Sequence, residues 1–258
     1  MKAILAFSLF LLMLIGCSPR NAPDLVVLDG STMGTVYAVK IVPSDLQKSG
    51  IIPDSLHRQI DSLLADINNQ MSTYIPESQI SRFNRYKKTD WFPVSADLCQ
   101  VIKRALDISR LSDGAFDITV GPLVNLWGFG PEQRNRLVPD ETEIQARKKL
   151  VGYQKIHTCF DPPAVRKDLP GIYCDLSAIA KGFGVDKLCG YLESRGLANF
   201  LVDIGGEIKT RGKNHQGKLW KIGIATPSEQ GGVQKVVPMV NTAVATSGDY
   251  RNYFEVDT

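Results

Sequence analysis

The segment from Ser112 to Gly130, SDGAFDITVGPLVNLWGFG, combines residue types that neither a plain helix nor a plain strand requires together. Gly114 and Gly121 permit a close approach of the backbone, while Asp117 and Thr119 offer side-chain oxygens between apolar neighbours. A proline and a glycine-rich aromatic end favour a bent path for the chain. This pattern is typical of backbone that contacts a ligand.

Four side chains in such motifs are candidates for ligand binding, and each also has a purely structural interpretation. Tyr74 follows Met-Ser-Thr, and by itself such a tyrosine is more often a half-buried core residue. A lone helical lysine such as Lys181 is most often a solvated side chain. Asp117 and Asp175 occupy positions where aspartate usually caps a turn or a helix. The residue types alone leave both interpretations open.

The sequence lacks the spacings of several well-defined catalytic and cofactor sites. No CxxC or HExxH pattern occurs, so a zinc site is not expected, and no GxxxxGK[ST] phosphate loop is present. His57, His157 and His215 lie outside the motifs described below, and we assign none of them to catalysis. The formal net charge is +3 and no basic stripe is interleaved with aromatic residues, so nucleic-acid binding is not expected.

The amino-terminal segment is typical of a lipoprotein signal peptide. Lys2 precedes an apolar run too short for a membrane-spanning helix, and Cys17 follows at the position of a lipobox cysteine. We expect a signal peptide over residues 1–16, a lipidated, palmitate-bearing cysteine and tether over residues 17–30, and a folded domain over residues 31–258. This arrangement predicts an exported protein anchored on the periplasmic side of a bacterial inner or outer membrane. The alternative is a leader that is cleaved without lipidation.

The remaining cysteines are compatible with a disulfide in an exported protein. They are Cys99, Cys159, Cys174 and Cys189. Cys159 and Cys174 flank an expected hairpin around residues 161–171 and are the best candidates for a pair. The spacing does not distinguish a disulfide from free buried thiols.

Apolar periodicity predicts an α+β fold with mixed helices and mostly antiparallel strands. Helices are expected over the apolar series Leu56–Ile67, over Asp97–Leu111 with Ser95 as its cap, over Asp140–Leu150 and over Ala178–Ser194. Strands are expected at Thr35–Ile41, as an outer strand, and at Ile172–Leu176, Asn199–Ile204, Glu207–Arg211, Trp220–Ala225 and Val236–Val240. The strands are grouped late in the chain, which favours α+β over a doubly wound sheet.

Six separate motifs, taken in order, resemble one known family. They are Met33-Gly34-Thr35, MSTYIPESQISRFN at Met71–Asn84, the Ser112–Gly130 segment, CDLSAIAKGFGVD at Cys174–Asp186, LVDIGGEIKTRG at Leu201–Gly212 and ATSGDYRNYFEVD at Ala245–Asp257. On these motifs the chain resembles the FAD:protein FMN transferases, the ApbE-like flavin transferases. The resemblance covers nearly all of the chain after the leader.

The resemblance implies a magnesium-dependent transferase and flavoprotein that moves the FMN part of FAD onto a threonine or serine hydroxyl, with release of AMP. The acceptor would be an exported or membrane redox protein, so the implied process is protein flavinylation. The carbonyl of Ala178 would be a metal ligand. The implied FAD contacts are Met33, Tyr74, Ala115, Phe116, Asp117, Asp175 and Lys181, with the Trp127–Gly130 segment behind them.

The resemblance ends before two carboxyl-terminal motifs of the family. Family members continue past residues 247–250 into a His-Ile-Ile-Asp-Pro type motif and an Asp-Ala-x-Ser-Thr type motif, and neither occurs here. These segments supply the family's histidine and the residues that complete its metal site, so we assign no catalytic residue. The Ala178 carbonyl alone would hold Mg²⁺ poorly, because this ion prefers six oxygen ligands. A strand expected at Tyr250–Val256 would lack its next neighbour.

Two other functions stay open on the sequence. The first is a noncatalytic or fragmentary flavin-binding lipoprotein. The second is a solute-binding lipoprotein without flavin, which would share the leader and the mixed fold but would not require the AFD and DLSAIAKG motifs together. The sequence identifies neither the acceptor protein nor the oligomeric state.

Overall fold

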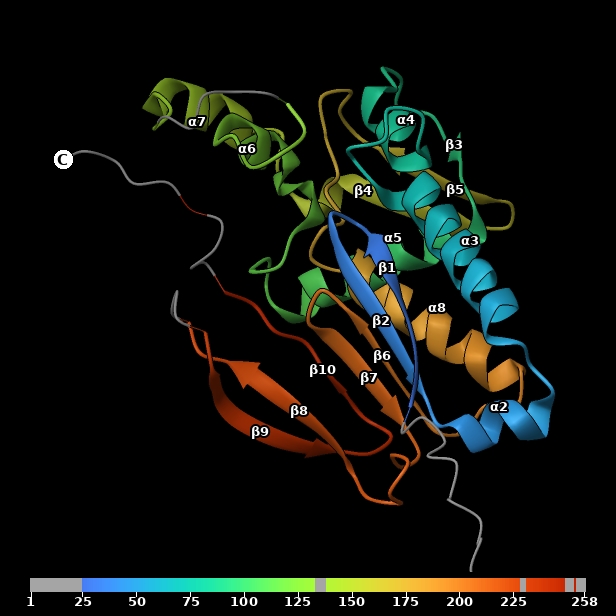
Figure 1. Cartoon of the computed structure of the whole chain (residues 1–258). Helices are drawn as coiled ribbons and strands as arrows, with labels where there is room; N and C mark the ends of the chain where they lie inside the picture. Colours follow the sequence, from blue (N-terminus) through green and yellow to red (C-terminus); the bar gives the residue numbers. More distant parts are fainter. Residues whose placement is uncertain (1–24, 133–137, 228–230, 249–252, 254–258) are drawn as a thin grey trace, which may run out of the picture.

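The computed structural model describes residues 25–132, 138–227, 231–248 and 253. Its central element is a five-stranded antiparallel sheet, shown in Figure 1, with the strand order β1-β2-β6-β7-β10. The strands are β1 (Val26–Thr32), β2 (Thr35–Ile41), β6 (Phe200–Ile204), β7 (Glu207–Arg211) and β10 (Ala243–Val244). Together with the helices described below, this sheet confirms the predicted α+β class.

The prediction that Thr35–Ile41 is an outer strand is wrong, because β2 lies between β1 and β6. Its edge is covered by β1, which pairs in register from Val26 opposite Ile41 to Thr32 opposite Thr35. The β1 sequence contains Asp29, Gly30 and Ser31, so its alternation of apolar and polar residues is too weak to predict a strand. The pairing with β2 stabilises β1 nevertheless.

Helices α2 (Pro43–Ser49), α3 (Pro53–Met71) and α8 (Ala180–Ser194) belong to the layer on one face of this sheet. Four apolar residues of α3 that the sequence predicted on the core side, Leu56, Ile60, Leu64 and Ile67, are buried, and Leu63 is half-buried. The first core is formed by inward side chains of β2, β6, α3 and α8. They include Tyr37, Val39, Ile60, Leu64, Leu188, Phe200, Val202 and Ile204.

A second apolar core lies around the carboxyl-terminal end of α3 and the start of α8. Its elements are α4 (Gln79–Arg85), α5 (Ala96–Leu111) and a small sheet of β3 (Phe92–Pro93), β5 (Pro163–Lys167) and β4 (Ile156–Phe160) in the order β3-β5-β4. Ser95 caps α5 as predicted, since its hydroxyl accepts the Leu98 N–H at 3.1 Å. The connection from α5 to β4 contains η2 (Ile118–Val120), α6 (Gly121–Leu126), α7 (Glu141–Lys148) and η3 (Tyr153–Lys155).

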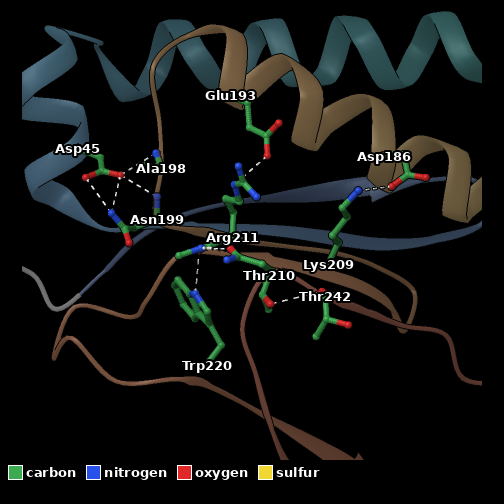
Figure 2. Close-up of polar contacts among 12 residues, drawn as sticks. Asp45, Asp186, Glu193, Ala198, Asn199, Lys209, Thr210, Arg211, Trp220 and Thr242 are labelled. Carbon is green, nitrogen blue, oxygen red and sulfur yellow. Dashed lines mark hydrogen bonds and ion pairs between the residues drawn. The ribbon is translucent and has the colours of Figure 1, made fainter.

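The opposite face of the five-stranded sheet is covered by a ribbon of β8 (Trp220–Ala225) and β9 (Val233–Met239). Leu201 and Ile208 point to this face, because side chains alternate along a strand. Figure 2 shows a contact between the ribbon and β7: the Trp220 indole donates to the Arg211 carbonyl at 3.2 Å.

A buried carboxylate in α2 fixes the chain just before β6. The Asp45 carboxylate accepts from the backbone N–H groups of Ala198 and Asn199.

The predicted strand at Ile172–Leu176 is not formed, and α8 begins two residues later than expected. The backbone of this segment has its partners elsewhere. The Asn84 side chain accepts from the Cys174 N–H at 2.8 Å and donates to the Cys174 carbonyl at 2.9 Å, and the Asp175 N–H donates to the Ile118 carbonyl at 2.7 Å. Because these groups are already satisfied, the segment needs no neighbouring strand.

The other late elements agree with the sequence to within a few residues. Gly205 and Gly206 form the turn between β6 and β7 with φ of 58° and 93°, values that favour glycine. The helix α8 ends before Gly196, as predicted. The strand expected at Tyr250–Val256 falls outside the described residues apart from Tyr253.

The described cysteines are free. Cys159 and Cys174 are therefore two thiols and do not form the disulfide that the sequence left open. Cys174 is fully buried, and this burial raises the pKa of its thiol to about 12. Within the described ranges, no helix is long and apolar enough to cross a membrane.

A buried cation, Lys167, joins the small sheet to α4. Its ammonium donates to the carbonyls of Phe83 and Asn84 at 3.0 Å each and of Ile172 at 3.2 Å. The side chain is 0% exposed, and burial lowers its pKa to about 8. The charged form is therefore less favourable in the folded protein than in the unfolded chain, where the pKa of a lysine is about 10.4.

We predict that the stability of the protein rises with pH through Lys167. Below pH 8 the lysine is charged in the folded protein, and the full cost of burying that charge is present. Above about pH 10.4 the lysine is neutral in both the folded and the unfolded state, and this cost is absent. Relative to Lys167→Met, the native protein should gain about 2–3 kcal/mol in the free energy of unfolding between about pH 7.5 and 10.5. Urea denaturation measures this difference. The exposed control Lys88→Met should follow the native protein, and parallel pH curves for Lys167→Met would contradict the prediction.

Candidate functional site

The turn between β1 and β2 places Met33 against the start of α8. Met33 and Gly34 both have positive φ, 50° and 70°, and this conformation is uncommon for a residue with a side chain. A Cβ atom added to Gly184 would lie 3.1 Å from Met33 Cε and 3.2 Å from Ile204 Cδ1. The glycine in α8 therefore allows the helix, the turn and β6 to meet closely.

Tyr74 lies in the turn after α3, and its side chain is largely exposed, at 64%. Its hydroxyl donates to the Phe129 carbonyl at 3.2 Å, so the Met71–Asn84 motif meets the Trp127–Gly130 segment here. The interpretation of Tyr74 as a half-buried core residue is wrong. An exposed aromatic face held by its hydroxyl is suited to stacking on a planar ligand.

Met33, Tyr74 and Lys181 line one cavity of about 610 Å³, although they come from three distant segments of the chain. The residues around them in this cavity include Gly34, Met71 and Ser177. Lys181 lies in the first turn of α8, where the backbone N–H groups and the positive end of the helix dipole also favour anions. The cavity therefore combines an aromatic face, a thioether and a cation.

Lys181 forms an ion pair with Glu207, the first residue of β7, at 2.8 Å between Nζ and Oε2. Both side chains are mostly buried, with exposed fractions of 30% for Lys181 and 17% for Glu207. The interpretation of Lys181 as a freely solvated side chain is therefore wrong. Sequence reasoning assigned no role to Glu207, although its position directly after the Gly205-Gly206 turn was a usable signal.

Asp117 has a structural role that its sequence position also allowed. Its carboxylate accepts from the Thr119 N–H at 2.8 Å, the Thr119 hydroxyl at 2.7 Å and the Tyr153 N–H at 2.8 Å. Phe116 packs against the second core. Ala115, Phe116 and Asp117 do not line the Tyr74 cavity, although Phe116 and Met33 pack against the same second core.

Asp175 likewise caps the approach to α8. Its carboxylate accepts from the N–H of Ser177 at 2.8 Å and from the Ser177 hydroxyl. This contact orders the segment that leads to Ala178 and Lys181. The implied FAD contacts of Asp175 and of the Ala115–Asp117 triplet stay predictions, and their observed bonds are to the protein itself.

Ala178 lines a second cavity, of about 720 Å³, on another side of the α8 start. Glu207 and Gly182 also line it, together with residues of α5 and β10. In the part of the chain that the structure describes, no group of three His, Cys, Asp or Glu side chains is arranged to hold a metal ion. The Ala178 carbonyl therefore has no carboxylate cluster beside it among these residues.

Two of the histidines have contacts that explain them without catalysis. The Nε2 atom of His57 lies 2.9 Å from the Tyr37 hydroxyl and 3.0 Å from the Asp29 carbonyl, and that of His157 lies 2.8 Å from Asp168. Neither histidine lines the two cavities described above.

Comparison with known protein families matches residues 33–258 to the ApbE family. The chain belongs to the ApbE family. Its curated relatives include an FAD:protein FMN transferase of Vibrio cholerae, 46% identical over 249 residues that make up 96% of this chain and 72% of the relative. A second FAD:protein FMN transferase, from Haemophilus influenzae, is 42% identical over 92% of this chain and 69% of its own length.

Solved ApbE structures share the fold. The flavin transferase ApbE from Vibrio cholerae superposes with a TM-score of 0.81 at 43% identity, covering 90% of this chain and 74% of the solved chain. The apo flavinyl transferase ApbE from Pseudomonas stutzeri gives a TM-score of 0.78 at 34% identity, covering 90% and 73%. These similarities confirm the resemblance that the motifs indicated, and they agree with the α+β class that the apolar periodicity predicted.

We predict that Asp117→Ala lowers the free energy of unfolding by about 2–4 kcal/mol, because three hydrogen bonds lose their acceptor. Urea denaturation measures the loss. The matched control is Asp140→Ala, which removes an exposed cap of α7 and should lower the free energy of unfolding by less than Asp117→Ala does. If Asp117→Ala unfolded like the native protein yet lost FAD binding, the structural role would be contradicted.

Proposed function

We propose that this protein is an FAD:protein FMN transferase that modifies a threonine or serine hydroxyl of an exported or membrane redox protein. The observation that carries the proposal is the convergence of Met33, Tyr74 and Lys181 on one cavity. These three residues come from separate motifs. The family resemblance implies that each of them contacts FAD. Relatives at 46% and 42% identity are FAD:protein FMN transferases.

The proposed reaction is a phosphoryl transfer. The acceptor oxygen attacks the phosphorus nearer the riboflavin and forms a new P–O bond, while the bond from this phosphorus to the bridging oxygen breaks. AMP leaves with that oxygen, and the proton of the acceptor hydroxyl is released to solvent. Such chemistry depends on position and charge neutralisation rather than on a covalent enzyme intermediate.

The residues of the cavity supply these two requirements. Tyr74 offers its ring as a stacking surface for one of the ligand's planar ring systems, and Met33 contributes an adaptable apolar contact. The Lys181 ammonium and the start of α8 provide positive charge for the diphosphate. The chain therefore binds and orients FAD with groups from three different elements.

Magnesium belongs to this proposal as the cation that would neutralise phosphate charge. The carbonyl of Ala178 is the one donor that the resemblance assigns among the described residues. These residues do not by themselves fit the six-oxygen preference of Mg²⁺, since no cluster of three His, Cys, Asp or Glu side chains is found in the described ranges. We therefore derive no catalytic step through the metal.

Transfer is tested by incubating the purified protein with FAD, Mg²⁺ and a redox domain that carries an acceptor threonine. We expect covalent FMN on the acceptor, seen as flavin fluorescence in a denaturing gel, and none on a Thr→Val acceptor. Tyr74→Ala should weaken FAD binding about 5–20-fold through lost stacking, and Tyr74→Phe should stay within about threefold.

Two outcomes would contradict the proposal in different ways. FAD binding without any transfer, beside an active relative, would favour the noncatalytic flavin-binding lipoprotein. A flat FAD titration would contradict flavin recognition altogether and favour the solute-binding alternative.

Export and lipid anchoring are also part of the proposal, and they rest on the sequence of residues 1–30. Cys17 would carry lipid after removal of residues 1–16, leaving the domain on the periplasmic side of an inner or outer membrane. We expect radiolabelled palmitate to enter the native protein in cells and not the Cys17→Ala variant. Equal labelling of both proteins, or of neither, would contradict the anchor.

A further inference from the structure

The wall between the two cavities is formed in part by one ion pair. Lys181 lines the cavity that contains Met33 and Tyr74, whereas Glu207 lines the one that contains Ala178. The two charged groups meet at 2.8 Å across this wall. An anion that attracts the Lys181 ammonium into the Tyr74 cavity therefore competes with Glu207.

The carboxylate of Glu207 depends strongly on this lysine. Its Oε2 atom is buried and has no hydrogen-bond partner among the described residues, so the ion pair with the ammonium at 2.8 Å is its compensating contact. A buried charge without a partner is costly, which gives the pair a strong mutual preference in the ligand-free protein. In the observed geometry the Lys181 ammonium is therefore neutralised by Glu207 and is not free to bind phosphate.

The position of Glu207 is fixed by its surroundings. A Cβ atom at Gly205 would lie 2.6 Å from Thr35 Cγ2, so the turn before Glu207 is pressed against the start of β2. The Gly205 N–H donates to the Val36 carbonyl at 3.0 Å, and the Gly206 N–H donates to the Asp203 carboxylate at 2.9 Å. Glu207 therefore stands on a rigid turn, while Lys181 has the longer and more flexible side chain.

We infer that Glu207 is a positioning residue that holds Lys181 in the ligand-free protein and competes with the diphosphate for its ammonium. The inference rests on the proposed placement of FAD beside Lys181. Glu207 lowers the affinity for every phosphate ligand of the cavity, the AMP product included. Its pairing with Lys181 after transfer favours product release, because the site is neutralised again without help from solvent ions.

The inference is tested by titrating FAD and, separately, AMP into the native protein and its variants, with binding followed by flavin fluorescence or calorimetry. Glu207→Gln keeps the shape of the side chain and removes its charge. We expect it to tighten the binding of both ligands about three- to tenfold, and to lower the KM for FAD without raising kcat. Lys181→Met should weaken FAD binding at least about tenfold.

The double variant separates the effect of the pair from the effect of either residue. Once Lys181 is replaced by methionine, Glu207→Gln should change FAD affinity by less than about twofold, because no ammonium is left to release. Glu193→Gln is the matched control. It removes a carboxylate that pairs with Arg211 at 3.1 Å between the same two elements, α8 and β7, as Figure 2 shows, and it should leave FAD binding unchanged.

The outcomes distinguish this inference from the proposed function. If Lys181→Met weakens FAD binding but Glu207→Gln does not tighten it, the competition is contradicted and the placement of FAD stands. If Lys181→Met has no effect, the placement of FAD beside Lys181 is contradicted first. Should Glu207→Gln fail to fold, Glu207→Asp replaces it. The aspartate side chain is one methylene shorter, so its carboxylate lies farther from the ammonium. We expect Glu207→Asp to tighten FAD binding by a smaller factor than Glu207→Gln. Weaker or unchanged FAD binding would overturn the inference.

Discussion

The close contact of α8 with the β1–β2 turn and β6 is the constraint on which the candidate site depends. A Cβ atom at Gly184 would lie 3.1 Å from Met33 Cε and 3.2 Å from Ile204 Cδ1, so a larger side chain there would push against both neighbours. This contact fixes the start of α8 and therefore the positions of Ala178 and Lys181. A wider spacing would separate Lys181 from Glu207 and open the wall between the two cavities.

The site also lies where the two large apolar cores meet. Met33 and Leu63 pack against both cores, so the turn and α3 join layers that are otherwise built from different side chains. Rigid cores on either side hold the cavity walls, while the seam leaves space that neither core fills. Ligand pockets commonly occur at such junctions between packed units.

The sequence predicted those elements whose apolar pattern and caps are local. The helix α5 with its Ser95 cap and the Gly205-Gly206 turn are examples. The errors arose where distant residues decide the structure. Cys174 is held by Asn84, which lies 90 positions earlier, and no local pattern distinguishes that arrangement from a strand.

The same limit applied to the site. Motif resemblance brought Met33, Tyr74 and Lys181 forward, and the structure places these three on one cavity. It could not indicate that the Asp117 carboxylate also accepts from the Tyr153 N–H, or that Lys181 has a buried counter-ion, because both facts depend on contacts between separate elements. The Tyr74 hydroxyl also affects how the cavity receives a ligand. Its bond to the Phe129 carbonyl restricts the ring before any ligand arrives, so a stacking partner has less rotational freedom of the ring to remove.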